Sequence, residues 1–489
     1  MDGSHLPTGL GKRLGVAAAI AAPVAAALAA AERHQDTKSR HGGTTTGGAA
    51  LRDERSRIAH LLRRAGFGAS RLELDAAVAR GFDATLDRML EPQDERDAAD
   101  DLVSQINVPN RRLDEAQRWW LVRMRYTSRP LVEKMALFWH GHFTTSIAKV
   151  SNGNMQLMRQ LIQSFRTQGM GNFRDLLLNV SKDSTMSIWL DGRFNHKDAP
   201  NENYGRELQE LFTLGIGNYT EADVKAAARA FTGWTFGNNH EFVFDARDHD
   251  DGPKTFLGRT GNFNGDDIVD ILAGHPATAN HLATKLVRFF VSDPPDDNLV
   301  NNLAQTYLSS GYDMRSVLRA LFKSDAFSSP NAYHALIKSP AEFVAGTLRT
   351  LDIQTDGTPL PPIMAALGQE LFNPPNVAGW PGGTAWIATN TMLARNNMAN
   401  SIAAATATDS GWSTDFKRAF GLPATPTGSE LVSAVVNHLA GGDVTPGERD
   451  RLYQYLGVRP SDRVNLDRDE LKLRGLVYLT LTLPVYQLN

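Results

Sequence analysis

Stretches with the period of an α-helix recur from Leu51 onward, and this regular pattern constrains the fold more than any other feature. Residues 220–233 start with a threonine three positions before an aspartate, as in a capping box, and end in glycine. Residues 338–351 repeat the pattern with a serine cap and a proline in the first helical position. Alternating stretches are scarce, and residues 240–247 are the best strand candidate. The sequence therefore predicts a mainly α fold: a large multi-helical body with long functional loops and at most a small β-hairpin.

The composition excludes several classes of protein. Of the 489 residues, 42% are hydrophobic, which is enough for a sizeable core, and the net charge of −3 gives no electrostatic footprint for nucleic acid. The absence of cysteine excludes disulfides, thiolate metal sites and cysteine nucleophiles. No phosphate-binding loop, dinucleotide fingerprint, HExxH or GxSxG motif occurs, so we expect no nucleotide cofactor.

The first 50 residues differ from the rest of the chain. Lys12 and Arg13 precede an alanine-rich apolar run over residues 14–31, and a polar stretch rich in glycine and threonine follows. A basic start, an apolar middle and a small-residue end are typical of a secretory signal, although an alanine-rich cytosolic helix is the alternative. The run barely reaches the roughly 20 residues that a membrane-spanning helix needs. We expect an exported protein, extracellular or in the cell envelope, whose mature chain has no stable membrane span.

The chain divides into three parts by pattern. Residues 1–50 are expected to be a signal-like segment and a disordered linker, outside the fold. Residues 51–404 are expected to form the helical body that carries the site. The helical pattern is diluted from about residue 405, so residues 405–489 are expected to form a C-terminal helical subdomain.

Residues 198–215, DAPNENYGRELQELFTLG, predict one amphipathic helix whose polar face is rich in acids and amides. Helical spacing places Glu202, Arg206, Glu210 and Thr213 on one side of this helix. One interpretation is a solvated ladder of ion pairs from Glu202 through Arg206 to Glu210, worth roughly 0.3–0.5 kcal/mol per pair. The other is a site, in which Glu202 and Glu207 are acid/base or metal-ligand carboxylates and Arg206 orients them or binds a substrate anion. Substrate binding is predicted for the neighbouring polar side chains Asp191, Asn195, Asn201 and Asn203.

Two histidine-containing stretches are further candidates. In FWHGHFTTS, His140 and His142 are separated by one glycine, and on an extended or turning backbone both rings could meet one divalent metal ion. The alternative is a pair of half-buried, hydrogen-bonded histidines at a helix end. In DARDHDDGPKTFLG, His249 and Asp250 are predicted to complete the catalytic site, and Lys254 to contact substrate. A simple polar turn is the alternative for this loop.

A loop rich in proline and glycine over residues 373–390 carries two tryptophans. Aromatic rings on such loops often form a wall of a ligand site, and Trp380 is therefore a predicted substrate-binding residue. The alternative is that the rings only fasten the loop to the body.

Six stretches occur in an order that resembles the DUF1800 family: LLRRAGFGAS, FWHGHFTTS, LDGRFNHKDAPNENYGRELQELFTLG with its continuation, HDDGPKTFLG, KSPAEFV and LFNPPNVAGWPGG. The resemblance covers most of residues 55–400, and the block from Asn201 to Leu208 is its most specific mark. The family comprises large, commonly exported bacterial proteins of unassigned function. The resemblance implies export and an exported alkaline-phosphatase/sulfatase-like (DUF1501) partner, but no established reaction.

Two functions follow from these expectations. The first is an exported hydrolase, dependent on a metal ion or on carboxylates, that acts on a polar envelope or extracellular substrate, with carbohydrate as one candidate. The second is a non-enzymatic helical scaffold or partner of a DUF1501 protein, in which the polar cluster is a structural network. A solvent-reachable pocket lined by these groups would favour the enzyme, whereas a buried or scattered arrangement would favour the scaffold.

Overall fold

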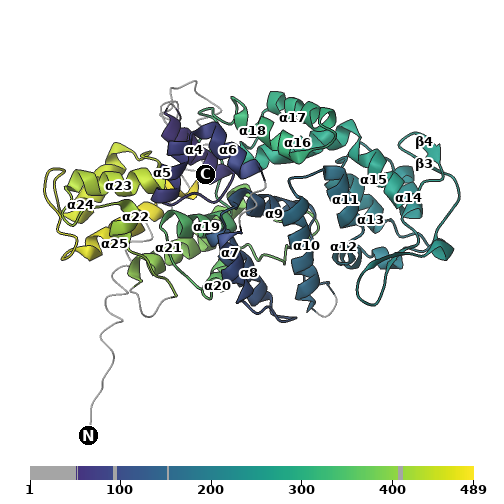
Figure 1. Cartoon of the computed structure of the whole chain (residues 1–489), viewed down its shortest axis with the longest axis horizontal. Helices are drawn as coiled ribbons and strands as arrows, with labels where there is room; N and C mark the ends of the chain where they lie inside the picture. The colour runs from purple at the N-terminus through teal and green to yellow at the C-terminus, as the bar shows by residue number, and fades with distance from the viewer. Residues whose placement is uncertain (1–50, 52, 92–95, 151–152, 406–410) are drawn as a thin grey trace, which may run out of the picture.

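The computed structural model describes residues 51, 53–91, 96–150, 153–405 and 411–489 (Figure 1). The predicted signal-like segment and linker, residues 1–50, lie outside the described residues. Residues 406–410, at the start of the predicted C-terminal subdomain, lie outside them as well. In the described part of the chain, no helix is both long enough and apolar enough to cross a membrane.

Helices dominate the described residues, which confirms the mainly α fold. The first are α4 (Glu54–Arg64), α5 (Arg71–Arg80), α6 (Phe82–Leu90), α7 (Ala98–Ser104), α8 (Leu113–Tyr126), α9 (Pro130–His142), α10 (Met155–Gln168), α11 (Phe173–Ser181) and α12 (Ser184–Trp189). Then follow α13 (Glu202–Glu207), α14 (Glu221–Ala230), α15 (Gly265–Ala273), α16 (Pro276–Phe290), α17 (Asp297–Ser309), α18 (Met314–Lys323), α19 (Pro340–Thr350) and α20 (Leu360–Ala366). The last are α21 (Thr389–Ala404), α22 (Phe416–Phe420), α23 (Gly428–Ala440), α24 (Pro446–Leu456) and α25 (Glu470–Leu481).

Short helices and short strands lie between the α-helices or extend their ends. The short helices are η2 (Gly192–Phe194), η3 (Leu208–Phe212), η4 (Ala246–Asp248), η5 (Gly383–Ile387) and η6 (Pro484–Gln487). Strands β1 (Trp234–Phe236) and β2 (Phe242–Phe244) pair in antiparallel fashion, and β2 lies in the predicted strand segment. A second hairpin, β3 (Lys254–Phe256) with β4 (Arg259–Gly261), was not expected from the sequence.

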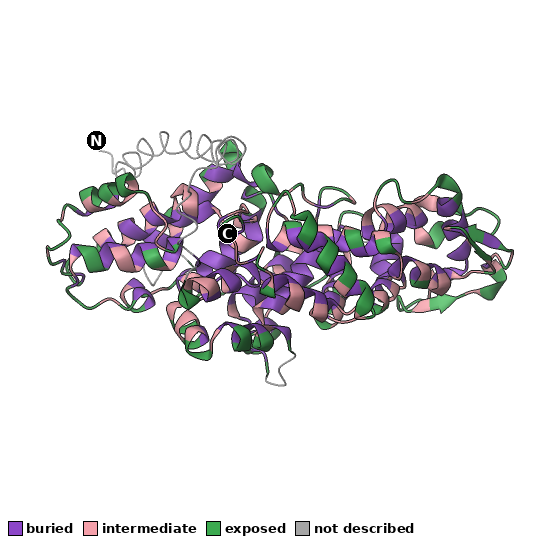
Figure 2. Ribbon diagram, turned by 90° about the horizontal axis from the view of Figure 1, so that it is seen from above, coloured by how far each residue is buried: buried purple, intermediate pink, exposed green. Residues whose placement is uncertain are grey.

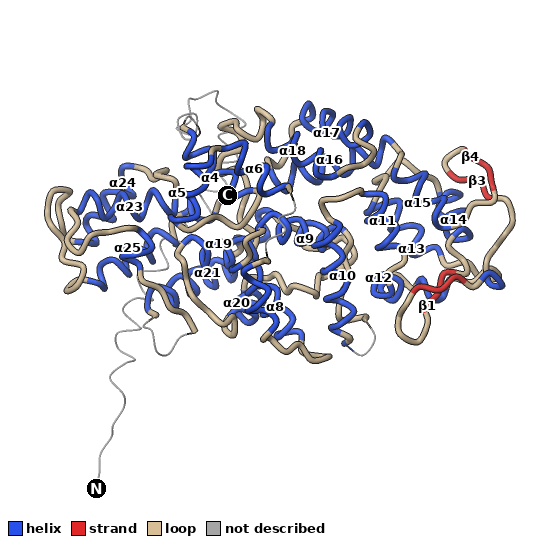
Figure 3. Tube along the Cα trace, in the orientation of Figure 1, coloured by secondary structure: helices blue, strands red, loops and turns tan. Residues whose placement is uncertain are grey.

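The molecule is elongated, and its parts follow one another along the long axis (Figure 1). Helices α22–α25 lie at one end, α4–α9 lie near the middle, and α11–α15 lie toward the other end. Both hairpins are at that second end, where the strands are drawn in red in Figure 3. Buried residues run through the interior along the whole length (Figure 2).

Local signals in the sequence set many helix boundaries. The capping boxes predicted at Thr220 and Ser339 are both formed: each hydroxyl accepts a hydrogen bond from the N–H three residues on, whose acidic side chain accepts from the cap N–H. Gly81 separates α5 from α6 with a φ of 89°, a conformation that favours glycine. These devices fix where helices start and stop without help from tertiary contacts.

A buried ion pair joins α9 to α19 in the middle of the molecule. Lys134 is fully buried and contacts Glu342 through its ammonium group, which also lies 5.3 Å from the ring centroid of Phe67. The second Glu342 oxygen accepts a hydrogen bond from the Ser339 N–H at 2.7 Å. Burial alone would raise the pKa of Glu342, but Lys134 and Ser339 outweigh burial and lower it. The pair is therefore well satisfied, and removing either partner would leave a buried charge alone.

We expect Lys134→Met to lower the free energy of unfolding by roughly 3–5 kcal/mol, because Glu342 would lose its counter-charge in the core. The control is Lys323→Met, which removes an exposed ion pair with Asp83 at 3.0 Å and should cost only about 0–1 kcal/mol. Urea denaturation followed by circular dichroism measures both. Equal, small effects would show that the Lys134 pair contributes no more than a surface pair.

Candidate functional site

The polar helix predicted over residues 198–215 changes its character halfway along. Asn201 caps α13, since its side-chain oxygen accepts from the Asn203 N–H at 2.9 Å. After Glu207 the chain widens into the π-helix η3, residues Leu208–Phe212. π-Helical turns are rare and occur frequently at functional sites. The block from Asn201 to Leu208, the most specific mark of the family resemblance, therefore ends at an irregular turn.

The π-helix alters the predicted ladder of ion pairs. Its first step is formed, with Glu202 3.1 Å from Arg206, but Arg206 then binds Glu221 on α14 through two nitrogens at 2.6 and 2.8 Å. Glu210 instead accepts a hydrogen bond from the Tyr219 hydroxyl at 2.6 Å. Thr213, predicted on the solvated side, is fully buried, so that prediction is wrong. The wider turn shifts later residues around the helix axis, and periodicity of 3.6 no longer applies.

Glu207 differs from the other predicted acids. Its side chain is half-buried and forms no hydrogen bond or ion pair with any of the residues that the structure describes. Burial raises its pKa, the nearby charge of Glu210 raises it further, and Arg206 opposes both. A carboxyl group with a raised pKa beside a second carboxylate is the arrangement that lets one act as acid and the other as base.

Basic side chains from two other helices bind the carbonyls that end η3. His281 and Lys285 of α16 both donate to the Leu211 oxygen, each at 3.0 Å, and His142 of α9 donates through Nε2 to the Phe212 oxygen at 3.1 Å. Since His142 Nε2 carries the proton, its Nδ1 accepts from the Lys285 ammonium at 3.1 Å. Neither His281 nor Lys285 was singled out from the sequence; the only signal is their spacing of four on one helix face.

Burial shapes the ionisation of this basic cluster, defined as His142, His281 and Lys285. Burial lowers the pKa of Lys285 to about 8. Burial, reinforced by the charge of Lys285, lowers the pKa of His281 to about 4 and that of His142 well below the usual value. Both histidines are therefore neutral at pH 7, which suits their role as single donors to carbonyls.

His140 and His142 do not share a site. Both lie within α9, whose last residue is His142, so the predicted extended or turning backbone is wrong and the rings are roughly 200° apart around the helix. His140 is fully buried, accepts from the Phe372 N–H through Nε2 at 3.0 Å, and has a pKa lowered by burial to about 3. Its ring lies 5.3 Å from that of Trp380.

The residues around the two histidines do not fit a metal ion held by both. Both ring nitrogens of His142 already have partners, and one nitrogen of His140 is taken by a backbone N–H. Among the described residues, no three acidic or histidine side chains are grouped so that they could hold a metal ion. The divalent metal ion stays a prediction, and no ligand set on the described chain supports it.

The predicted loop residues His249, Asp250 and Lys254 hold the loop in place at the end of α14. Asp250 binds Arg229 at 2.6 and 3.1 Å, and this contact lowers its pKa to about 2. The buried Lys254 ammonium donates to the Asp250 and Gly252 carbonyls. His249 Nδ1 lies 2.8 Å from the Thr232 carbonyl. Each group therefore has a structural partner.

The segment before α13 is held in the same way. Asn195 donates to the Ala228 carbonyl of α14 at 2.8 Å and accepts from the Asn201 N–H at 2.9 Å. Asp191 is 2.8 Å from Lys149 and accepts from Asn203 at 3.3 Å. His196 and Asp248, 2.6 Å apart, join this segment to the 245–254 loop. The structure thus brings two predicted segments together on α14.

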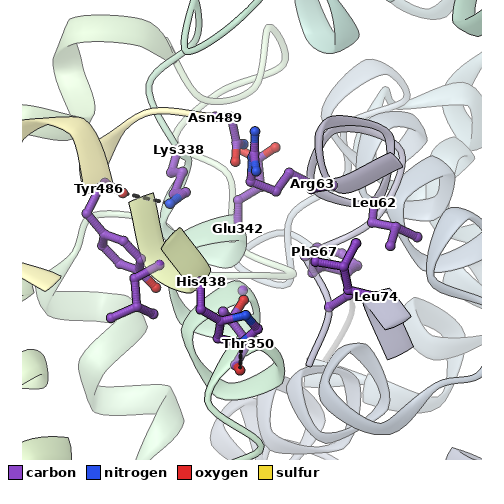
Figure 4. Close-up of a pocket in the computed structure, with 15 residues that line it drawn as sticks. Leu62, Arg63, Phe67, Leu74, Lys338, Glu342, Thr350, His438, Tyr486 and Asn489 are labelled. Carbon is purple, nitrogen blue, oxygen red and sulfur yellow. Dashed lines mark hydrogen bonds between the residues drawn. The ribbon is translucent and has the colours of Figure 1, made fainter. Parts of the chain in front are cut away.

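The predicted site residues do not line the main pockets found in the described part of the chain. None of four such pockets has a predicted site residue in its wall. A cavity of about 40 Å³ lies between α4, α19 and the last residues of the chain (Figure 4). Lys338 lines it and donates to the Tyr486 carbonyl at 2.6 Å. A larger cleft of about 610 Å³ is lined by residues between Leu62 and Arg349.

Comparison with known proteins gives a family and no activity. A family model described as "Protein of unknown function (DUF1800)" matches residues 60–488, which confirms the resemblance seen in the sequence. No curated protein and no solved structure matches the chain significantly. Function must therefore be argued from the chain itself.

We expect Glu207→Gln to raise the melting temperature at pH 7–8. Because the folded-state pKa of Glu207 is raised, the stability of the protonated form is lost as pH rises through that pKa, and glutamine imitates the neutral form. The gain should vanish below about pH 4, where glutamate is neutral in both states. Glu202→Gln is the control, which removes a partner of Arg206 and should bring no gain. A gain from Glu207→Gln that is independent of pH would contradict the assignment.

Proposed function

We propose that this chain, which belongs to the DUF1800 family of proteins of unknown function, is a non-enzymatic helical partner of an exported alkaline-phosphatase/sulfatase-like (DUF1501) protein. The observation that carries the proposal is that most of the predicted site residues make structural contacts. Apart from Glu207 and Trp380, they form hydrogen bonds or ion pairs with backbone groups and neighbouring side chains. Those around α14 hold a surface with exposed aromatic rings at one end of the molecule.

The held surface consists of η2 and the β1–β2 hairpin. Helix η2 follows Asp191 directly and packs against β1, while β2 leads into the loop that Asp250 fastens to α14. In the hairpin, Trp234 lies opposite Phe244 and Phe236 opposite Phe242, so the four rings share one face. Trp234 is buried and anchors the hairpin on the body. The network therefore fixes the position of a small aromatic module.

Three large apolar side chains of this module are exposed: Phe194 (53%), Phe244 (46%) and, on the opposite face of the hairpin, Val243 (39%). Phe194 and Phe244 are the two exposed phenylalanines in the described part of the chain. We call these two phenylalanines the apolar tip. Exposed apolar patches on soluble proteins mark interaction sites, and aromatic anchors supply much of the binding energy at interfaces. A protein partner would bury the tip.

Export of the chain is part of this proposal. The basic and apolar pattern of residues 12–31 supports it, because it would place the protein in the compartment of such a partner. The near-neutral charge of the whole chain suits recognition by apolar contact more than by charge.

We expect the Phe194→Ser, Phe244→Ser double variant to weaken binding of the DUF1501 protein at least 30-fold, since even one aromatic anchor at an interface contributes about 2 kcal/mol. Isothermal titration calorimetry with purified proteins measures this. Leu471→Ser is the matched control: its side chain is 80% exposed on α25, at the other end of the molecule. If the unchanged protein did not bind, or if the control lost as much affinity as the double variant, the proposal would be contradicted.

A carboxylate-dependent hydrolase is the second candidate, and Glu207 is the observation that favours it. Its carboxyl group has a raised pKa, has no hydrogen-bond partner among the described residues and lies beside Glu210. In this candidate Glu207 would give a proton to the leaving group, and Glu210, oriented by Tyr219, would activate water.

This candidate predicts that the purified protein hydrolyses chromogenic glycosides or esters, and that Glu207→Gln lowers kcat/KM about 10²–10⁴-fold. Glu202→Gln should leave the rate within about threefold, because Glu202 is an ion-pair partner of Arg206 and has no chemical role in this candidate. A chain without activity on a broad substrate panel would remove the hydrolase candidate and leave the partner proposal intact.

A further inference from the structure

The largest of the described pockets has no role in the functions considered so far. It is a cleft of about 610 Å³ near the middle of the molecule, where α4, α5, α6, α9 and α18 adjoin (Figure 1). Its volume lies within the range of about 300–1,000 Å³ that is usual for small-molecule sites. None of the residues that line the cleft belongs to the predicted site around α13 and α14 or to the apolar tip.

Arginine is the feature that distinguishes the walls of this cleft. Six arginines line it: Arg80, Arg88, Arg166, Arg315 and Arg349 come from five different helices, and Arg129 directly precedes α9. Neither lysine nor an aromatic residue is among the described lining residues. Arginine presents a planar set of donors that matches carboxylate and phosphate groups, so its repeated use points to anions with those shapes.

Four carboxylates line the cleft, and each has a partner of its own. The groups that bind Asp97 and Asp100 are not arginines of the walls. Asp97 accepts from the Thr127 hydroxyl at 2.6 Å, and Asp100 pairs with Arg123 at 2.7 Å. These two carboxylates therefore do not occupy the wall arginines.

The other two wall carboxylates are also engaged. Glu91 pairs with Arg319 at 3.0 Å, and Arg319 lies outside the cleft. Glu73 pairs with Arg349 at 2.6 Å, the one ion pair between two wall residues that the structure records in its described part.

Two of the arginines are available to a ligand. Arg315 is half-buried and donates Nε to the Leu90 carbonyl at 2.8 Å, but it forms no ion pair with any described carboxylate. Arg80 is exposed at the rim and likewise has no ion pair in the described part of the chain. Arg166 is already oriented, with Nε on the buried Glu133 at 2.6 Å and one terminal nitrogen on Gln163 at 2.5 Å. A partly buried guanidinium without a counter-charge favours an incoming anion.

Apolar side chains fill the spaces between the charged groups. Leu62, Met89 and Val132 belong to the wall and offer contact to an uncharged part of a ligand. Since the arginines come from separate segments around a cleft of this size, the cleft suits a ligand with more than one anionic group.

We propose that this cleft binds a small organic anion with two or more phosphate or carboxylate groups. Arg315 and Arg80 would bind it directly, and Arg166, positioned by Glu133, would complete the set. The proposal does not depend on the partner or hydrolase function, because none of its residues belongs to those sites.

Isothermal titration calorimetry of the whole purified chain with inorganic pyrophosphate, and separately with citrate, tests the proposal. We expect saturable binding of at least one probe with one site per chain, weakened by added sodium chloride because the contact is ionic. The probe that binds more tightly tells whether phosphate or carboxylate is the preferred group. The absence of saturable heat with both probes at millimolar concentration would overturn the proposal.

Variants separate the cleft from general attraction to a charged surface. Arg315→Gln should weaken binding about tenfold or more, because each lost charge-assisted hydrogen bond has roughly that effect. Arg80→Gln, at an exposed position where misfolding is no concern, should also weaken it. Arg459→Gln removes the same charge from an 88% exposed side chain in the C-terminal part and should leave binding unchanged. Equal affinity in the cleft variants, or an equal loss in Arg459→Gln, would contradict the assignment.

Discussion

Buried cations that donate to the carbonyls at helix ends hold this structure together. A helix leaves its last carbonyls without partners, and its end carries partial negative charge. Arg64 meets this need at the end of α16, where it binds the Phe290 and Val291 carbonyls at 2.9 and 2.5 Å. Arg349 binds the Arg125 and Thr127 carbonyls at the end of α8, both at 2.9 Å, and Lys285 does the same for η3. In a chain without cysteine, these contacts link helices that are far apart in sequence.

The same rule explains why so many polar side chains of the predicted site have structural partners. Loops that pack on α14 bury some backbone N–H and C=O groups away from water. Each such group needs a hydrogen-bond partner from the protein. Asn195 supplies one to the Ala228 carbonyl, and Lys254 supplies others within its own loop. A cluster of acids, amides and basic groups in a sequence is therefore ambiguous. It is expected at a catalytic site and equally where long loops are packed against helices.

The fold class and most helix starts could be predicted, because caps and periodicity are local properties. The boxes at Thr220 and Ser339 needed only four residues each. The π-helix at Leu208–Phe212 could not be predicted, because the alternative hydrogen bonding is stabilised by His142, His281 and Lys285, which are brought there by tertiary packing. The error about Thr213 and the separation of His140 from His142 have the same origin: side-chain direction was derived from an assumed backbone.

The cleft could not be predicted from the sequence, because its residues form no motif. Its arginines lie between Arg80 and Arg349, and no two share a motif, so nothing in the linear sequence indicates that they meet. A motif indicates chemistry only where the residues lie on one short segment, as they do around α13. A cleft whose arginines come from separate segments of the chain appears only when the helices are packed. In this family, whose members are described as of unknown function, the residues outside the recognisable blocks therefore deserve equal weight when function is sought.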